Sequence, residues 1–438
     1  MILVYCDHIT PRHRFIFRFI FEDVLGLGLH ITEDRNEFFS CQEPKINYSH
    51  SEIEGSIQFR PHSILSEPGI KAQDELLRQL NNITIEQLNL QPIEHLPFDP
   101  FALSFYLVTR YEEYLPFDND IHGRFPPEQS LAFKKNFLRI PLVDLLADKL
   151  KQKLEEHYPG LKIPGQPFRF IPSFDIDIAF AHLGKGWLRA SGAWMKILLK
   201  GNLKQARERI HTMAGKMDDP YDNFGLHLNL AEKYKLPLLY FVLLGDFNEF
   251  DRNVSYKNNR FRNLIKELNI NAEMGLHPSY RSHLNPELFE KEKKRLEGII
   301  EVPVSKGRFH FLRLNFPASY RLLLSGNIKD DYSLGYSTMN GFRASTCTPF
   351  FFYDLHKEEI TGLKIHPFIF MDSAMIDHLK LNPQDAVHEI GELVGQVEKY
   401  GGEAIGIWHN YSLCEKDQYK GWQEVLSITF EKYQNSGS

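Results

Sequence analysis

Two aspartates separated by one residue, Asp175 and Asp177, lie in the apolar run Ile171–Phe180. Side chains alternate along a strand, so both carboxylates would lie on the same face. Two like charges this close repel each other, and a fold normally avoids them unless a cation or a proton lies between them. The pair therefore indicates metal or proton-transfer chemistry, although a short D-x-D also fits a strand end whose acids face water.

Three histidines downstream each lie beside an apolar, strand-like run, namely His277, His310 and His409. A catalytic zinc needs three nitrogen or oxygen ligands and one open position. Asp177 and His277 are the first choices, and His310 and His283 are alternatives for the third ligand. His283 follows His277 by six residues, a spacing that does not place both on one helix face. Taken singly, each histidine is more often an ordinary side chain with satisfied hydrogen bonds.

Size and composition limit the classes of protein to consider. A chain of 438 residues with 42% hydrophobic and 25% charged residues is typical of a globular protein with two domains. A formal charge of −6 argues against nucleic-acid binding. Four cysteines without C-x-x-C spacing predict neither a zinc ribbon nor a disulfide framework, and they favour a reducing compartment.

The sequence gives no sign of export or membrane insertion. Asp7 and His8 interrupt the first apolar residues before a signal-peptide core forms. No apolar stretch approaches membrane-spanning length. We therefore predict a cytoplasmic location.

The chain divides best at Pro159–Gly165, which contains two glycines and two prolines. We predict an accessory α/β domain of unknown role over residues 1–160 and a second domain over 165–438. In the second domain, apolar strand candidates alternate with amphipathic helices. The strand candidates are Phe168–Ile176, Pro237–Leu244, Glu273–Leu276, Phe309–Leu314, Leu363–Met371 and Ala404–Trp408, and the helices include Leu203–Met213, Phe261–Leu268, Pro286–Ile300 and Pro383–Lys399. Repeated β-then-α units predict a parallel sheet, closed into a barrel or doubly wound.

The segment Gly184–Lys200 combines Trp187 and Trp194 with several basic residues and no acidic one. It fits a peripheral contact with a membrane surface or the lip of a substrate cleft. The alternative is a packed helix with a solvated basic face.

An ordered set of motifs extends across the second domain. They are S-F-D-I-D at 173–177, G-L-H-P-S-Y at 275–280, H-F-L-R at 310–313, D-D-Y-S at 330–333, G-F-R-A at 341–344 and I-W-H-N at 407–410. In this order they resemble the polysaccharide deacetylases of carbohydrate esterase family 4, the NodB homology group, over roughly residues 165–435. The resemblance is greatest to a bacterial branch that joins this domain to an N-terminal domain of unknown function.

The resemblance implies a distorted (β/α) barrel with fewer than eight strands and a divalent metal, usually zinc. The implied reaction removes an acetyl group from an N-acetylated sugar. By position, Asp175 resembles the general base, and Asp177 and His277 resemble metal ligands. Arg313 resembles the arginine that orients the base, and His409 resembles the general acid. A metal, a carboxylate and a histidine with these roles are chemically consistent with amide hydrolysis.

Two departures from the family pattern affect these assignments. Ile176 separates aspartates that are adjacent in typical members, so base and ligand could be exchanged. Arg281 occupies the usual position of the second histidine. The branch of greatest resemblance has a histidine ahead of the third-motif strand, which favours His310 over His283 as the third ligand. Arg343 is a second candidate to orient the base or to contact substrate.

The leading prediction is a metal-dependent hydrolase that deacylates an N-acylated sugar. Hydrolysis of another C–N bond, in a cyclic amide or ureide, is one alternative. A non-catalytic carbohydrate-binding protein with a decayed site is another, but a decayed site has no reason to keep every catalytic group. A cytoplasmic location favours a nucleotide-linked or lipid-linked sugar. The oligomeric state is not predicted.

Overall fold

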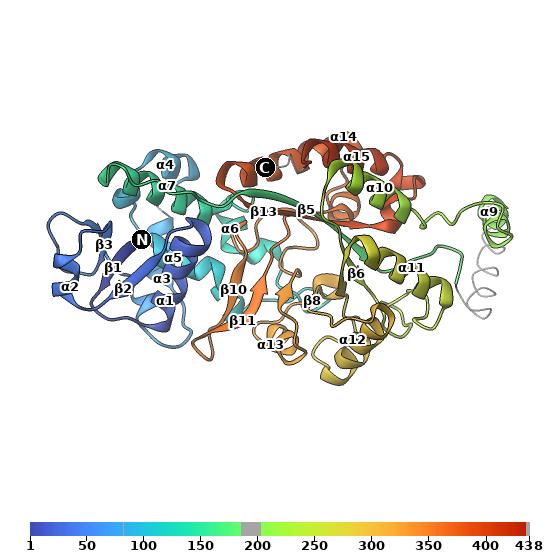
Figure 1. Cartoon of the computed structure of the whole chain (residues 1–438), viewed down its shortest axis with the longest axis horizontal. Helices are drawn as coiled ribbons and strands as arrows, with labels where there is room; N and C mark the ends of the chain where they lie inside the picture. The colour runs from blue at the N-terminus through green and yellow to red at the C-terminus, as the bar shows by residue number, and fades with distance from the viewer. Residues whose placement is uncertain (82, 185–202, 435–438) are drawn as a thin grey trace.

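The computed structural model describes residues 1–81, 83–184 and 203–434, and its described residues form two sheets flanked by helices (Figure 1). Residues 1–158, called the N-terminal region, contain a four-stranded sheet in the order β2-β1-β3-β4. The remaining residues, called the C-terminal region, contain a nine-stranded sheet. Its order is β10-β11-β9-β8-β7-β6-β5-β13-β12.

The N-terminal region alternates strands and helices. Its strands are β1 Ile2–Cys6, β2 Leu29–Thr32, β3 Lys45–Tyr48 and β4 Ile57–Phe59. Its helices are α1 Pro11–Arg18, the π-helical turn η1 Phe19–Val24, α2 Arg35–Ser40, α3 Asp74–Leu80, α4 Ile85–Leu90, α5 Pro100–Val108, α6 Leu131–Lys134 and α7 Leu142–His157. All four strands are parallel. Every residue of β1 is buried, as expected for a parallel strand covered on both faces.

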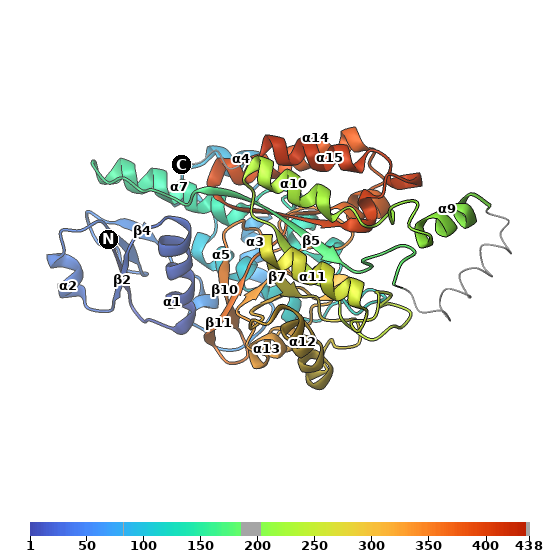
Figure 2. The ribbon, with the colours of Figure 1, turned by 45° about the vertical axis from the view of Figure 1, so that its right-hand side comes forward.

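The C-terminal region follows the same alternation over a longer stretch. Its strands are β5 Phe168–Ile176, β6 Leu239–Val242, β7 Glu273–Leu276, β8 Lys306–Gly307, β9 Asp330–Asp331, β10 Phe350–Asp354, β11 Glu359–Ile365, β12 Phe370–Met371 and β13 Gly402–His409. Its helices include α9 Leu203–Met213, α10 Phe224–Tyr234, α11 Asn259–Asn271, α12 Pro286–Ile300, α13 Ala318–Ser325, α14 Pro383–Tyr400 and α15 Trp422–Lys432. In both ribbon views, α14 and α15 lie along one side of the sheet and α12 and α13 along the other (Figures 1 and 2).

Residues 359–371 connect distant parts of the large sheet. The beginning of this stretch, β11, pairs in parallel with β9, and its end, β12, pairs in parallel with β13. Between them, the His366 amide donates to Asp331 O at 2.8 Å and the Ile369 amide donates to Ile405 O at 2.9 Å. One continuous stretch therefore contacts two strands, β9 and β13, that stand five places apart in the order of the sheet.

The sheet differs from the prediction in its strand count. It contains nine strands instead of fewer than eight, because β10 adds an antiparallel strand next to β11 and because residues 359–371 count twice, as β11 and β12. The architecture is mixed α/β with a largely parallel sheet. Its closure into a barrel stays a prediction.

The predicted strand Phe309–Leu314 is wrong. Residues His310–Leu312 form a 3-10 turn, η6, and the nearest strand, β8, ends at Gly307. Phe311 and Leu312 have φ values of 60° and 52°, which an extended strand cannot contain. Phe168–Ile176, Glu273–Leu276 and Pro286–Ile300 are confirmed to the residue.

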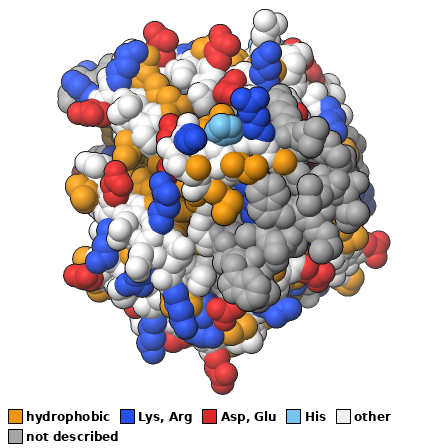
Figure 3. All heavy atoms as spheres, turned by 90° about the vertical axis from the view of Figure 1, so that its right-hand side faces the viewer, with side chains coloured by type: hydrophobic (Ala, Val, Ile, Leu, Met, Phe, Trp, Pro, Cys, Tyr) orange, Lys and Arg blue, Asp and Glu red, His pale blue; other side chains and the backbone are white. Residues whose placement is uncertain are grey.

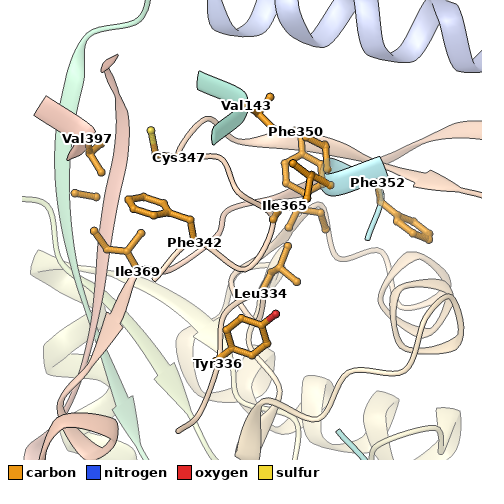
Figure 4. Close-up of a cluster of buried hydrophobic side chains, with 14 of the residues drawn as sticks. Val143, Leu334, Tyr336, Phe342, Cys347, Phe350, Phe352, Ile365, Ile369 and Val397 are labelled. Atoms are coloured by element: carbon orange, nitrogen blue, oxygen red, sulfur yellow. The ribbon is translucent and has the colours of Figure 1, made fainter. Parts of the chain in front are cut away.

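A single apolar core extends through both regions. Val143 of α7 lies among side chains of the C-terminal region in Figure 4, beside Phe350 of β10. Ion pairs also cross between the regions, because Arg343 contacts Glu113 in a buried pair and Arg12 contacts Glu358 in a partly buried one. The predicted boundary at Pro159–Gly165 falls between α7 and β5, but two separate domains stay a prediction.

The basic segment Gly184–Lys200 lies, beyond its first residue, outside the described residues, so its predicted membrane contact has no structural counterpart to report. On the described part of the face in Figure 3, side chains of both charge signs lie among apolar and uncharged ones. Within the described ranges, no helix combines the length and apolar character needed to cross a membrane.

Candidate metal centre

Three predicted ligands, Asp177, His277 and His310, converge near the carboxyl ends of strands β5, β7 and β8 of the large sheet. Asp177 follows β5, His277 follows β7, and His310 opens η6 shortly after β8. One potential ligand atom from each lies within 4.8 Å of the other two. Parallel strands place their carboxyl ends on one edge of a sheet, where such folds bind their ligands. The sheet therefore brings Asp177 together with His277 and His310, which follow it by 100 and 133 positions in the sequence.

Both imidazoles are held so that Nε2 is free to bind a metal. Nδ1–H of His277 donates to the carbonyl oxygen of Arg308 at 2.6 Å. Nδ1–H of His310 donates to Oδ1 of Asp251 at 2.9 Å. Because these bonds use Nδ1 as the donor, Nε2 keeps its lone pair in the neutral ring. Metal-binding histidines are typically oriented by such a bond from the other nitrogen.

The Asp177 carboxylate completes the group. Its Oδ1 is buried and has no hydrogen-bond partner, although it lies 3.1 Å from Nε2 of His277. Its Oδ2 lies 3.7 Å from Nε2 of His310. Ligand atoms around one tetrahedral zinc ion are about 3.3 Å apart. The Asp177 carboxylate faces one imidazole nitrogen through each of its oxygens, and both separations fit ligands of a shared divalent metal. A metal would also give the buried Oδ1 the partner that it lacks among the described residues.

Charges around Asp177 favour its ionised form. Burial alone would raise the pKa of this carboxyl, but the neighbouring His310, His277 and His409 hold it well below its usual range. Burial lowers the pKa of His310, but Asp177 and Asp251 outweigh it and raise this pKa to about 9. Metal binding would therefore displace a proton from His310.

Local sequence fixes the position of His277. Gly275 in β7 has no room for a side chain, because a Cβ would lie 2.5 Å from the Phe241 ring and 3.2 Å from the carbonyl oxygen of Lys306. Beyond His277, the chain turns at Ser279, whose amide and hydroxyl both donate to Glu292 of α12. The glycine and the buried carboxylate together hold the histidine at the sheet edge.

Asp175 lies beside the three ligands and is held by an arginine. Nη1 of Arg308 donates to Oδ1 of Asp175 at 2.8 Å, and Nη2 donates to the Ser173 hydroxyl at 2.9 Å. Oδ2 of Asp175 lies 3.8 Å from Nε2 of His277. All four side chains are buried, and such a charge-assisted bond stabilises the carboxylate.

His409 lies on another side of Asp177, with Nε2 at 3.6 Å from Oδ2 of that residue. Its Nδ1–H donates to Oδ1 of the fully buried Asp372 at 2.6 Å. Ser412 donates to the same carboxylate. Burial alone would lower the pKa of His409, but Asp372 and the more distant Asp177 raise it to about 9. The imidazole is therefore oriented and favoured in its protonated form.

Two arginines and one histidine from the prediction lie elsewhere. Arg313 does not reach Asp175, because its guanidinium donates to the carbonyl oxygens of His122 and Tyr280. Arg343 binds Glu113 of the N-terminal region in a bidentate pair. His283 bonds through Nε2 to Ser319 and is not among the three converging ligands. The geometry thus favours His310 over His283, and it gives Arg308 the contact predicted for Arg313.

Sequence reasoning missed Arg308, Asp251 and Asp372. Arg308 stands two residues before His310, and Asp372 directly follows a predicted strand, so a search of strand ends for charged residues would have found both. Asp251 lies in a loop far from any predicted strand end. Its role depends on a contact across 59 residues of sequence, which no local pattern signals.

A cavity of about 410 Å³ opens beside the three ligands. Its lining includes two of them, Asp177 and His310, together with the rings of Phe250, Phe311 and Tyr411. Small-molecule sites have volumes of this order, with apolar walls and a few polar groups. The cavity therefore has room for a small molecule next to Asp177 and His310.

One family model and several solved structures are similar to parts of this chain. A family model described as "Family of unknown function (DUF7033)" matches residues 2–159, and no curated protein matches the chain. Among solved structures, the chain is similar to the allantoinase Puue, with 12% identity over 73% of this chain and 93% of that one and a TM-score of 0.39. It is also similar to a protein from Mycobacterium smegmatis described as a polysaccharide deacetylase, with 14% identity over 62% and 86% of the two chains and a TM-score of 0.38. Similarities at these TM-scores carry no argument about fold or function.

Proposed function

We propose that the protein is a metal-dependent hydrolase that cleaves the amide bond of an N-acylated sugar. The observation that carries the proposal is the convergence of Asp177, His277 and His310 within 4.8 Å. A carboxylate and two imidazoles are typical ligands of a catalytic zinc, so zinc is the proposed ion. When bound, the ion would supply Lewis-acid chemistry toward the amide carbonyl and lower the pKa of a water molecule.

Asp175 is the proposed general base. Its carboxylate lies 3.8 Å from the ligand nitrogen of His277, within reach of a water molecule at the centre. The Arg308 guanidinium donates to its other oxygen at 2.8 Å. This contact fixes the orientation of the carboxylate, which accepts a proton as the proposed base. The family resemblance gives Arg313 the role of orienting the base, and we assign this role to Arg308 instead.

His409 is the proposed general acid. Its Nε2 faces the centre and its Nδ1–H is bonded to Asp372. The buried carboxylate favours the imidazolium form, which donates its Nε2 proton to the leaving nitrogen. Base and acid approach Asp177 from different strands, β5 and β13. This arrangement suits one proton taken from water and one delivered to the amine.

The proposed substrate class is an N-acetylated sugar. It rests on the ordered motifs that resemble the deacetylase family and on the aromatic lining of the cavity by Phe250, Phe311 and Tyr411, because sugar rings stack on such side chains. A distorted barrel closed through residues 359–371 is the proposed form of the C-terminal region, since this stretch pairs with both β9 and β13.

The test is a substrate panel assayed with purified, zinc-loaded protein. We expect acetate release from at least one N-acetylated sugar or sugar nucleotide, and loss of that release after chelation and its return after zinc is added back. A parallel arm offers cyclic amides and ureides and monitors ring opening. Ring opening without acetate release would replace the proposed substrate class, and zinc-independent turnover would contradict the metal centre.

A further inference from the structure

A loop of the N-terminal region, residues 118–124, reaches the turn that carries the ligand His310. Nη1 of Arg124 donates to the carbonyl oxygen of Phe311 at 2.8 Å. In the opposite direction, Nε of Arg313 donates to the carbonyl oxygen of His122 at 3.0 Å. The two regions are thus joined by reciprocal hydrogen bonds directly beside the candidate metal centre.

The loop holds Arg124 in place before it meets the turn. Oδ1 of Asp120 accepts bonds from the amides of His122 and Arg124 at 2.8 and 2.9 Å. Oδ2 of Asp120 accepts a bond from Nε of Arg124 at 2.7 Å. The Arg124 side chain is only 13% exposed. A partly buried, ion-paired guanidinium has few alternative conformations, so its Nη1 keeps a fixed direction.

The turn that receives this bond has an unfavourable backbone conformation. Phe311 has φ 60° and ψ 9°, and Leu312 has φ 52°. Residues with a side chain rarely adopt this left-handed region, and two in succession persist only when the surroundings hold them. The bond from Arg124 acts on the peptide unit between Phe311 and Leu312, one residue beyond the metal ligand His310.

The same loop also extends the aromatic wall of the cavity. The His122 ring lies 4.9 Å from the Phe311 ring, and its Nδ1 lies 3.3 Å from the Tyr280 hydroxyl. Tyr280 in turn stacks on Phe250 at 4.0 Å. Phe250 and Phe311 both line the cavity next to Asp177. The N-terminal region therefore supports the cavity wall as well as the ligand turn.

We propose that Arg124 is a positioning residue for the metal ligand His310, and that the N-terminal region is consequently part of the catalytic unit. The inference rests on the metal centre proposed above. Arg124 does not touch the centre itself. It acts through the Phe311 carbonyl, by keeping the η6 turn in the conformation that directs Nε2 of His310 toward Asp177.

The test measures zinc affinity by competition with a chromophoric chelator in the full-length protein. We expect Arg124→Ala to bind zinc about 10-fold more weakly than the wild type, the lower end of the usual effect of removing an outer-sphere partner. The zinc affinity of Arg124→Lys, which keeps the charge and one donor, should lie between those of the wild type and Arg124→Ala. The matched control is Arg12→Ala, which removes another buried arginine that crosses between the regions, at Glu358, and should lower the melting temperature without changing zinc affinity.

The outcomes separate this inference from the proposed function. Zinc binding by the wild type with unchanged affinity in both Arg124 variants overturns the positioning role and leaves the hydrolase proposal intact. Failure of the wild type to bind zinc overturns the metal centre itself. A loss of zinc affinity in Arg12→Ala as large as that in Arg124→Ala also overturns the positioning role. It would show that any loss of contact between the regions weakens zinc binding. If Arg124→Ala does not fold, Arg124→Lys decides by the same measurement.

Discussion

Both sheets end their strands in polar residues, but the two sets of side chains are used differently. At the end of β3, Nδ2 of Asn47 donates to the carbonyl oxygen of Ser51 at 2.7 Å, and Oδ1 accepts from the Ser49 hydroxyl at 2.7 Å. Tyr48 donates to Asp99. In the C-terminal sheet, by contrast, Oδ1 of Asp177 is buried without a hydrogen bond.

The two sheets differ in whether the polar side chains at their strand ends keep an atom without a hydrogen bond after folding. In the N-terminal sheet, these groups are satisfied by one another and by the backbone, as buried polar groups normally are. In the C-terminal sheet, each ligand histidine has one nitrogen bonded and the other aimed at Asp177. A polar strand end is therefore a poor indicator of a site. Convergent atoms without internal partners are a better one.

The largest expected effect is loss of the metal. Asp177→Asn and His277→Ala should each reduce zinc content close to zero after dialysis, because each removes one of three ligands. Elemental analysis of the purified variants measures this. His310→Ala should behave in the same way, whereas the control His283→Ala should keep its zinc, since its ring bonds to Ser319 instead. Retained zinc in His310→Ala together with loss in His283→Ala would reverse the choice of third ligand.

The next effect separates chemistry from metal binding. His409→Ala should keep its zinc and lose turnover by about 10²- to 10⁴-fold, the usual contribution of a general acid. Asp372→Asn should also keep zinc and lose less turnover, because Asp372 acts only through the His409 ring, which it orients and favours in the protonated form. Turnover is measured as the initial rate of acetate release, and zinc content is determined on the same samples. Full activity in His409→Ala would remove this residue from the mechanism.

The smallest expected effect is a loss of stability in a variant of the N-terminal region. It tests whether the polar groups of that region serve the fold and not the metal centre. Asp99 accepts bonds from the amides of Phe101, Ala102 and His62 and from the Tyr48 hydroxyl. In Asp99→Asn, the amide NH₂ would face two of these donors, because each carboxylate oxygen accepts two of the bonds. Unfolding in urea should therefore show a loss of about 1–2 kcal/mol. Zinc content and turnover should not change. A loss of zinc here would mean that the two sheets do not differ as described.

The sequence predicts well what local pattern determines. Phe168–Ile176 and Glu273–Leu276 are short apolar runs bounded by turn residues, and Pro286–Ile300 begins with a proline after a capping asparagine. These features need no knowledge of distant contacts. Asp177 and His277 were candidates because they follow apolar strand candidates, whereas the preference for His310 over His283 came from the family resemblance.

What could not be predicted depends on contacts between distant residues. Phe309–Leu314 has the composition of a strand, but its positive φ values reflect bonds from Arg124 and other residues remote in sequence. The pair of Arg308 and Asp175 joins positions 133 residues apart. Motif order favours Arg313 as the arginine that orients the base. The order of motifs shows which residues are present, but it does not show which of the two nearby arginines, Arg308 or Arg313, points toward Asp175.

The dual pairing of residues 359–371 also restricts how this chain can vary in length. Only positions 366–369 separate β11 from β12, and Asp372 follows β12 directly. An extra or missing residue there would have to shift β11 by one place, which turns its alternate side chains to the opposite face, or displace Asp372 from His409. Insertions are ordinarily accommodated in connections between strands. The connection at 366–369 is an exception, because its length determines whether Asp372 reaches His409, the proposed proton donor.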